Sequence, residues 1–127
     1  GWLRANPAEA PGILAANPSQ VFFREIIGEG PVGAMGIAVT PGVSVAADPL
    51  FMPLGAPLLV ETSITASGAP LAAMMVAQDT GGAIKGANRI DLFRGAGQTA
   101  RTEAGAQSAP ARILILIPRA AAARLLP

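Results

Sequence analysis

Short apolar segments separated by turn-forming residues run through most of this 127-residue chain. Segments of about four to eight residues, bounded by glycine, proline, asparagine or serine, are typical of β-strands rather than of long helices. The pattern predicts strands at 21–27, 35–39, 44–47, 57–63, 71–78 and 112–117. The last strand contains five consecutive large apolar residues (113–117) and is therefore expected to be buried.

Two segments predict helices. Asn6 is a good N-cap, proline suits the first helical turn, and the helix is expected to cover 7–16. A second helix is expected at 98–107, ahead of Pro110. Turns are expected where glycine, proline and serine cluster, at 28–33, 66–70 and 81–86.

These elements give a mainly β chain with short helices, most simply a barrel. The expected division is an N-terminal helix and linker at 1–18, a β-rich domain at 19–118 and a C-terminal tail at 119–127. The apolar runs are far shorter than the roughly 20 residues that a membrane helix needs.

Composition narrows the chemistry. The chain has no histidine, cysteine or tyrosine, which excludes Ser-His and Cys-His catalysis and disulfides. The net charge of +1 gives no electrostatic reason to expect nucleic acid or an anionic membrane as partner. We expect neither a metal ion nor another cofactor, so acid–base chemistry has to use carboxylates.

Asp79 and Asp91 are the strongest candidates for that chemistry. Twelve positions separate them, and a glycine-rich segment carrying Lys85 lies between. Such a loop can double back and bring both carboxylates to one cleft. Ile90 and Leu92 flank Asp91 and are expected to desolvate it, which would keep it protonated as an acid. The simpler alternative is that either aspartate only caps a turn.

Three glycine-containing motifs have weaker interpretations. Residues 28–33 fit GxGxxG, but no helix follows, so a turn is expected there. Residues 79–81 (Asp-Thr-Gly) resemble an aspartic-protease motif, which would need a homodimer to supply a second aspartate. Residues 81–86 lack the spacing of a phosphate loop, yet their backbone and Lys85 can approach a ligand.

Several segments, taken together, resemble one known family. They are 17–25, 33–36, 40–48, 53–57, 75–86 and 89–97. They resemble the C-terminal part of the membrane-bound lytic murein transglycosylase A family, called the 3D domain after three aspartates. The match runs over about 15–118, the block 75–86 is its most specific part, and the three aspartates would be Asp48, Asp79 and Asp91.

The resemblance implies half of a double-psi β-barrel, the other half coming from an N-terminal segment. It also implies a lytic transglycosylase that acts on peptidoglycan glycan strands. Such an enzyme cleaves the β-1,4 bond between N-acetylmuramic acid and N-acetylglucosamine without water. The muramyl C6 hydroxyl attacks C1 and leaves a 1,6-anhydro end, so one carboxyl serves as acid and then as base.

By matching position, Asp91 is the expected acid–base residue, and Asp79 would hold substrate or tune Asp91; the two roles could be exchanged. Asp48 is expected mainly to fix the loop beside Pro49. Candidate substrate-binding residues are Gln78, Gly81, Gly82, Lys85 and Asp48.

The resemblance is incomplete. Val43 stands where the family usually has arginine, and 111–118 lack the family's aromatic residues. The first barrel half is absent, so the expected partner is that half or a second copy of the chain. Localisation is expected to be periplasmic and associated with the outer membrane, with membrane attachment only through a lipid anchor outside this chain. The alternative function is a non-catalytic 3D-type fragment that binds glycan or completes a barrel.

Overall fold

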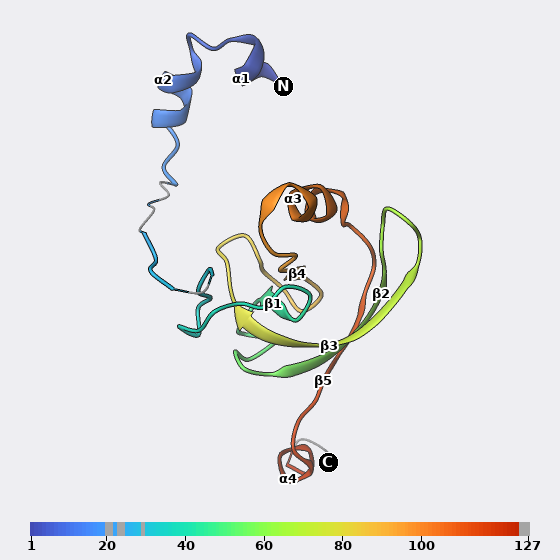
Figure 1. Cartoon of the computed structure of the whole chain (residues 1–127). Helices are drawn as coiled ribbons and strands as arrows, with labels where there is room; N and C mark the ends of the chain where they lie inside the picture. The colour runs from blue at the N-terminus through green and yellow to red at the C-terminus, as the bar shows by residue number, and fades with distance from the viewer. Residues whose placement is uncertain (20–21, 23–24, 29, 125–127) are drawn as a thin grey trace.

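A five-stranded mixed sheet forms the centre of the protein (Figure 1). The computed structural model describes residues 1–19, 22, 25–28 and 30–124. The strands, in the spatial order β4-β1-β3-β2-β5, are β1 (Ser44–Ala47), β2 (Pro57–Ser63), β3 (Pro70–Asp79), β4 (Ile90–Leu92) and β5 (Arg112–Ile115). The helices are α1 (Trp2–Ala5), α2 (Ala10–Ala15), α3 (Gly97–Ala106) and α4 (Arg119–Ala122). The mainly β prediction is confirmed.

An antiparallel hairpin of β2 and β3 is the longest part of the sheet. Leu58 pairs with Met75 and Val60 with Ala73. The turn closes where the Ile64 N–H donates to the Ala69 carbonyl oxygen (2.8 Å). The predicted strands at 57–63 and 71–78 and the turn between them are therefore confirmed.

The core lies where β1, β2 and β3 meet. Leu58 and Val60 alternate with half-buried neighbours along β2, as expected for a strand with one face in the core. Burying a side chain such as Leu58 or Met75 contributes about 1.5–3 kcal/mol. The buried cluster consists of Val45, Ala47, Met52, Leu58, Val60, Met75 and Ala77.

β1 runs parallel to β3 and carries a register shift that bears on the site. Val45 pairs with Ala77, but the next residue, Ala46, pairs with Asp79. Gln78 is therefore the extra residue of a bulge. Bulges bend a strand and redirect its side chains. This bulge lies directly before Asp79, the last residue of β3, and therefore affects the direction of the Asp79 side chain.

Two predicted elements near the N-terminus differ from the structure. The helix expected at 7–16 begins only at Ala10. Asn6 instead follows the end of α1, where its side-chain amide donates to the Trp2 carbonyl oxygen (2.9 Å). The strand expected at 35–39 is reduced to one bridge, Val32 to Ala38, around a turn with Gly36 at φ +75°.

The strand expected at 21–27 has residues 21, 23 and 24 outside the described residues, and 22 and 25–27 are not in a strand. The predicted helix at 98–107 is confirmed as α3. β4 was not predicted, because three residues are too few to give a pattern.

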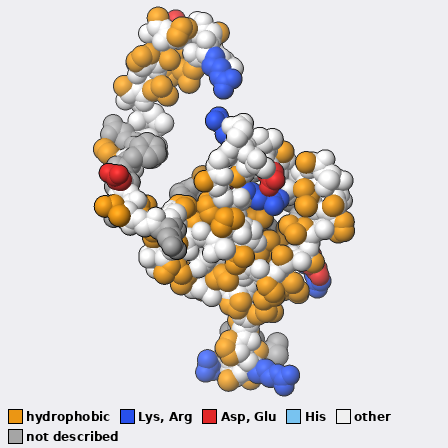
Figure 2. All heavy atoms as spheres, viewed as in Figure 1, with side chains coloured by type: hydrophobic (Ala, Val, Ile, Leu, Met, Phe, Trp, Pro, Cys, Tyr) orange, Lys and Arg blue, Asp and Glu red, His pale blue; other side chains and the backbone are white. Residues whose placement is uncertain are grey.

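The strand predicted at 112–117 exists as β5, but the prediction that it is buried is wrong. Leu114 and Ile115 are 37% and 38% exposed. In the described part of the chain β5 is the last strand of the sheet and pairs with β2 alone. Leu116 and Ile117, just beyond it, are also exposed. Apolar side chains are spread widely over the face seen in Figure 2.

No helix within 1–19, 22, 25–28 and 30–124 is long and apolar enough to cross a bilayer.

Candidate active site

Asp79 and Asp91 lie on the two strands that flank β1. Ala46 of β1 pairs with Asp79 of β3 on one side and with Asp91 of β4 on the other. Since neighbouring strands are about 4.8 Å apart, the two aspartate backbones lie about 10 Å apart. The sheet, rather than a loop folding back, therefore brings the two residues near each other.

Asp91 is held by an arginine. The Arg89 Nε and Nη2 donate to the Asp91 Oδ1 and Oδ2 at 3.2 and 3.3 Å. The hydrogen bond with Asp91 and the charge of its carboxylate raise the pKa of Arg89 above its ordinary value. The Asp91 side chain is 50% exposed, so the predicted desolvation by Ile90 and Leu92 is wrong: the Asp91 side chain reaches solvent beside Arg89.

The same arginine connects Asp91 to the glycine-rich loop at 81–86. The Arg89 Nη1 donates to the Ala83 carbonyl oxygen at 2.8 Å. Ile84, the next residue, is buried and its N–H donates to the Gly81 carbonyl oxygen. The loop is thus held at two points, with Gly82 and Lys85 exposed.

Asp79 supports a neighbouring turn. Its Oδ1 accepts the Ala34 N–H at 2.9 Å. Gly33 packs so closely that a Cβ there would lie 2.6 Å from the Gln78 carbonyl oxygen. The Gln78 Oε1 accepts the Ser44 hydroxyl, so the side chains of both Gln78 and Asp79 have partners within the protein.

Asp48 lies inside the protein, with 3% of its surface exposed. Its Oδ2 accepts the Gly86 N–H (2.9 Å) and its Oδ1 accepts the Leu50 N–H (3.1 Å). The pKa of Asp48 is held below its ordinary value, mainly by the hydrogen bond from Gly86, and further by the bond from Leu50 and the nearby Lys85 ammonium. Asp48 therefore fixes both the loop after Pro49 and the end of the 81–86 loop.

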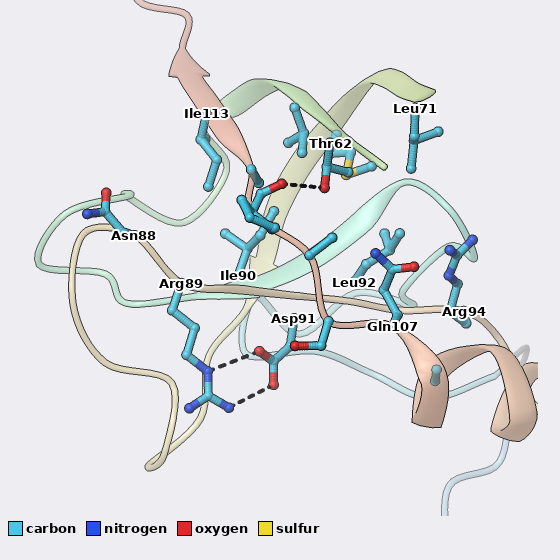
Figure 3. A pocket seen from close by; sticks show the side chains of 17 residues that line it. Thr62, Leu71, Asn88, Arg89, Ile90, Asp91, Leu92, Arg94, Gln107 and Ile113 are labelled. Carbon is cyan, nitrogen blue, oxygen red and sulfur yellow. Dashed lines mark hydrogen bonds and ion pairs between the residues drawn. The ribbon is translucent and has the colours of Figure 1, made fainter. Parts of the chain in front are cut away.

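A pocket of about 590 Å³ opens beside Asp91 (Figure 3). Asp91, Arg89 and Arg94 line it together with apolar residues of β2 and β3. Asp79, Asp48 and Lys85 are not among its lining residues. Of the two candidate acids, the structure brings only Asp91 into this pocket.

Residues 107–111, between α3 and β5, form another wall of the pocket. Gln107 Nε2 donates to the Ser63 carbonyl oxygen (2.9 Å), and the Thr65 N–H donates to Gln107 Oε1 (3.2 Å). The Thr62 hydroxyl donates to the Pro110 carbonyl oxygen (2.8 Å), as drawn in Figure 3. These bonds tie this wall to the β2–β3 hairpin.

Comparison with known proteins gives the family. The family model described as "3D domain" matches residues 43–117, which include Asp48, Asp79, Asp91 and the whole 81–86 loop. The chain belongs to the 3D domain family.

The relatives of this 3D domain chain are lytic transglycosylases by name. "Membrane-bound lytic murein transglycosylase A" of Vibrio cholerae is 39% identical over 110 residues, which is 82% of this chain and 30% of the relative. The solved structure of a membrane-bound lytic murein transglycosylase from Agrobacterium tumefaciens is 39% identical, with a TM-score of 0.83 over 97% of this chain and 35% of that chain. The E. coli structure "with bound chitohexaose" is 31% identical, with a TM-score of 0.76 over 90% and 36%.

The predicted resemblance to lytic murein transglycosylase A is thus confirmed. The 3D domain chain spans about a third of the length of the relatives it matches.

Two charged lining residues of this 3D domain, Arg89 and Arg94, were not predicted as site residues from the sequence. Arg89 could have been found, because it directly precedes β4 and lies two residues from Asp91, which is the spacing of side chains on one face of an extended chain. Arg94 follows β4 outside any regular element, and no sequence pattern predicts its contact with the pocket.

Proposed function

We propose that the chain supplies the acid–base residue of a lytic transglycosylase that cleaves peptidoglycan. The bond is the β-1,4 linkage between N-acetylmuramic acid and N-acetylglucosamine, and the product is a 1,6-anhydromuramyl end. The placement of Asp91 in a pocket, within a chain whose relatives carry that name, is the observation that supports this function.

In this mechanism one carboxyl group acts twice. In its protonated form, released from Arg89, Asp91 donates its proton to the glycosidic oxygen, and the bond between that oxygen and the muramyl C1 breaks. The muramyl C6 oxygen then bonds to C1, and its hydroxyl proton returns to the Asp91 carboxylate. The proton balance closes without water, so no second carboxylate is needed as base or nucleophile, unlike in glycoside hydrolysis.

The contacts favour Asp91 over Asp79 for this role. Asp91 is half exposed on the pocket wall, and its two hydrogen bonds to Arg89 are long for a charged pair. Those bonds can be exchanged for contacts to substrate at little cost. Asp79 is bound to the Ala34 N–H and shapes the turn beside β3, so it acts by positioning the strand end.

Substrate contacts are proposed at the exposed part of the 81–86 loop. Lys85 and Gly82 are exposed there and would contact the sugar, with Gly81 setting the loop's path. Gln78 and Asp48, whose side chains already have partners, would hold the base of the site without touching the glycan.

The sheet is proposed to be part of a double-psi β-barrel whose remainder lies outside this chain. The parallel β1–β3 pair within a mixed sheet and the exposed apolar residues of β5 support this arrangement. The remainder of a longer protein, or a second copy, would then cover the open sheet. The 19–118 segment is the proposed domain, with 1–18 as an N-terminal helix and linker and 119–127 as the C-terminal tail. We assign the chain to the periplasm and outer membrane, with any lipid anchor outside the chain; the word "membrane-bound" in the relatives' names supports this assignment.

The experiment is to incubate the chain with purified peptidoglycan, alone and with the N-terminal remainder supplied, and to search for 1,6-anhydromuropeptides by mass spectrometry. Asp91→Asn, which keeps the side-chain shape, is expected to lower product formation by about 1,000-fold. Asp79→Asn is the matched control and is expected to retain most of the activity. Full activity of Asp91→Asn would refute the assignment, and no product in either preparation would leave the fragment as the non-catalytic alternative.

A further inference from the structure

Arg94 has an unusual environment in the pocket. Its Nε is buried and has no hydrogen-bond partner among the residues that the structure describes. A buried N–H without a partner is costly, and such groups in folded proteins generally await a water, an ion or a ligand. The rest of the Arg94 side chain is partly exposed and lines the same pocket as Asp91.

Among the residues that the structure describes, Arg94 is the cation of the pocket lining that has no acidic partner. Three charged side chains line the pocket, and Asp91 is paired bidentately with Arg89. In Figure 3 Arg89 and Arg94 are drawn on either side of Asp91. The side-chain amide of Gln107, another lining residue, is hydrogen-bonded to the backbone of Ser63 and Thr65. In the described part of the chain the only ion pairs are Arg89–Asp91 and Arg112–Glu61, so the pocket carries one uncompensated positive charge at Arg94.

We propose that Arg94 binds a carboxylate of the glycan substrate. A guanidinium presents parallel N–H donors that match the two oxygens of a carboxylate, and such bonds are stronger than those between neutral groups. The proposal rests on the function proposed above. In peptidoglycan the carboxylate comes either from the lactyl group of a peptide-free muramic acid or from a stem peptide.

Arg94 would therefore determine specificity. A polymer of N-acetylglucosamine alone is neutral and offers Arg94 no partner, whereas a muramyl polymer does. The E. coli relative was solved with bound chitohexaose, so a neutral glycan can occupy such a protein. The carboxylate contact is accordingly an added preference and not a requirement for binding.

The test compares three glycans of equal length by titration calorimetry at low salt. They are chitohexaose, a peptide-free alternating hexasaccharide with lactyl carboxylates, and the same hexasaccharide with stem peptides. The wild-type chain is expected to bind at least one carboxylated glycan roughly tenfold more tightly than chitohexaose, because a charged hydrogen-bonded pair contributes about that much. The glycan that shows the gain identifies the source of the carboxylate.

Variants locate the effect. Arg94→Gln is expected to remove the preference, Arg94→Lys to retain part of it, and Arg119→Gln, the same charge change on α4, to leave it intact. Added salt is expected to reduce the preference. Because the main comparison uses the wild-type chain, it stands even where a variant fails to fold.

The anhydro product is measured in the same samples. Equal binding of all three glycans, or an unchanged preference in folded Arg94→Gln, overturns the role of Arg94, while product formation would still support the transglycosylase. A carboxylate preference without any product, even with the N-terminal remainder supplied, contradicts the transglycosylase and leaves the carboxylate site standing. Failure of every glycan to bind contradicts both.

Discussion

Asp79 and Asp91 are paired with the same residue, Ala46, from the two strands on either side of β1. They use their carboxylates differently. The Asp79 carboxylate accepts the backbone N–H of Ala34 in a turn. The Asp91 carboxylate accepts side-chain hydrogen bonds from Arg89 at the wall of the pocket. One aspartate is therefore tied to the protein's own backbone and the other is available to a ligand.

Asp79→Ala is expected to lower the free energy of unfolding by about 1–2 kcal/mol, because the Ala34 N–H loses its acceptor. Asp79→Asn keeps an oxygen at the same place and is expected to lose less. Urea denaturation of the three proteins checks the order. Equal stabilities of wild type and Asp79→Ala would show that the bond to Ala34 does not hold the turn.

Arg89→Ala is expected to loosen the 81–86 loop, since it removes the bonds to Ala83 and Asp91. Hydrogen exchange of the Ile84 N–H, which donates to Gly81, should become severalfold faster. Arg112→Ala is the control because it removes the other ion pair, with Glu61, on the far edge of the sheet. Unchanged exchange in Arg89→Ala would contradict the link between the loop and Asp91.

The stability is expected to depend on pH through Asp48. Its pKa lies below the ordinary value of 3.8 in the folded protein, so the unfolded chain takes up the proton first. The stabilisation that the Asp48 carboxylate contributes is fully present above pH 3.8. It is lost as the pH falls below 3.8 through the folded-state pKa of Asp48. Asp48→Asn puts an N–H₂ group opposite one of the two backbone N–H donors and is expected to lower Tm by roughly 5 °C at neutral pH. The Tm difference between the two proteins should shrink below pH 3.8, and a difference independent of pH would contradict this account.

Gly33→Ala is expected to destabilise the protein by about 2 kcal/mol, because the new methyl group would lie 2.6 Å from the Gln78 carbonyl oxygen. Gly82→Ala is the matched control, since a Cβ there meets nothing within 4 Å. Thermal melts of both variants make the comparison. Similar melting temperatures would mean that the turn beside Asp79 shifts freely.

Leu58→Ala is expected to cost about 3 kcal/mol, because Leu58 is fully buried at the centre of the sheet. Leu116→Ala removes the same atoms from an exposed position and is expected to change stability by less than about 0.5 kcal/mol in this chain. If a further barrel segment covers Leu116 when supplied, the cost of that second change should rise. No rise would argue that the segment packs elsewhere.

The predictions that succeeded rest on local patterns. In the strands 57–63 and 71–78, apolar residues alternate with polar ones or follow one another, and turn-forming residues bound both segments. α3 lies between a glycine-rich segment and Pro110. Each of these elements could therefore be predicted from its own residues. The exposure of β5 could not be predicted from its residues, because an apolar run such as 113–117 is found both in central strands and in edge strands. The pairing of β5 with β2 alone shows that it is an edge strand in the described part of the chain. Asn6 likewise has the chemistry of a cap, and its contact with Trp2 decides which helix it ends.

The sequence by itself determined the chemistry that is available: with no histidine or cysteine, carboxylates are the candidates, and three aspartates with a glycine-rich loop indicate the family. The tertiary structure decided which aspartate does what. Strand register sets Asp79 and Asp91 on either side of Ala46, and Arg89, Ala34 and Gly86 each engage one of the three carboxylates. Those partners are up to 45 positions away along the chain. A hydrogen bond depends on distance and direction in space, which spacing in sequence does not specify.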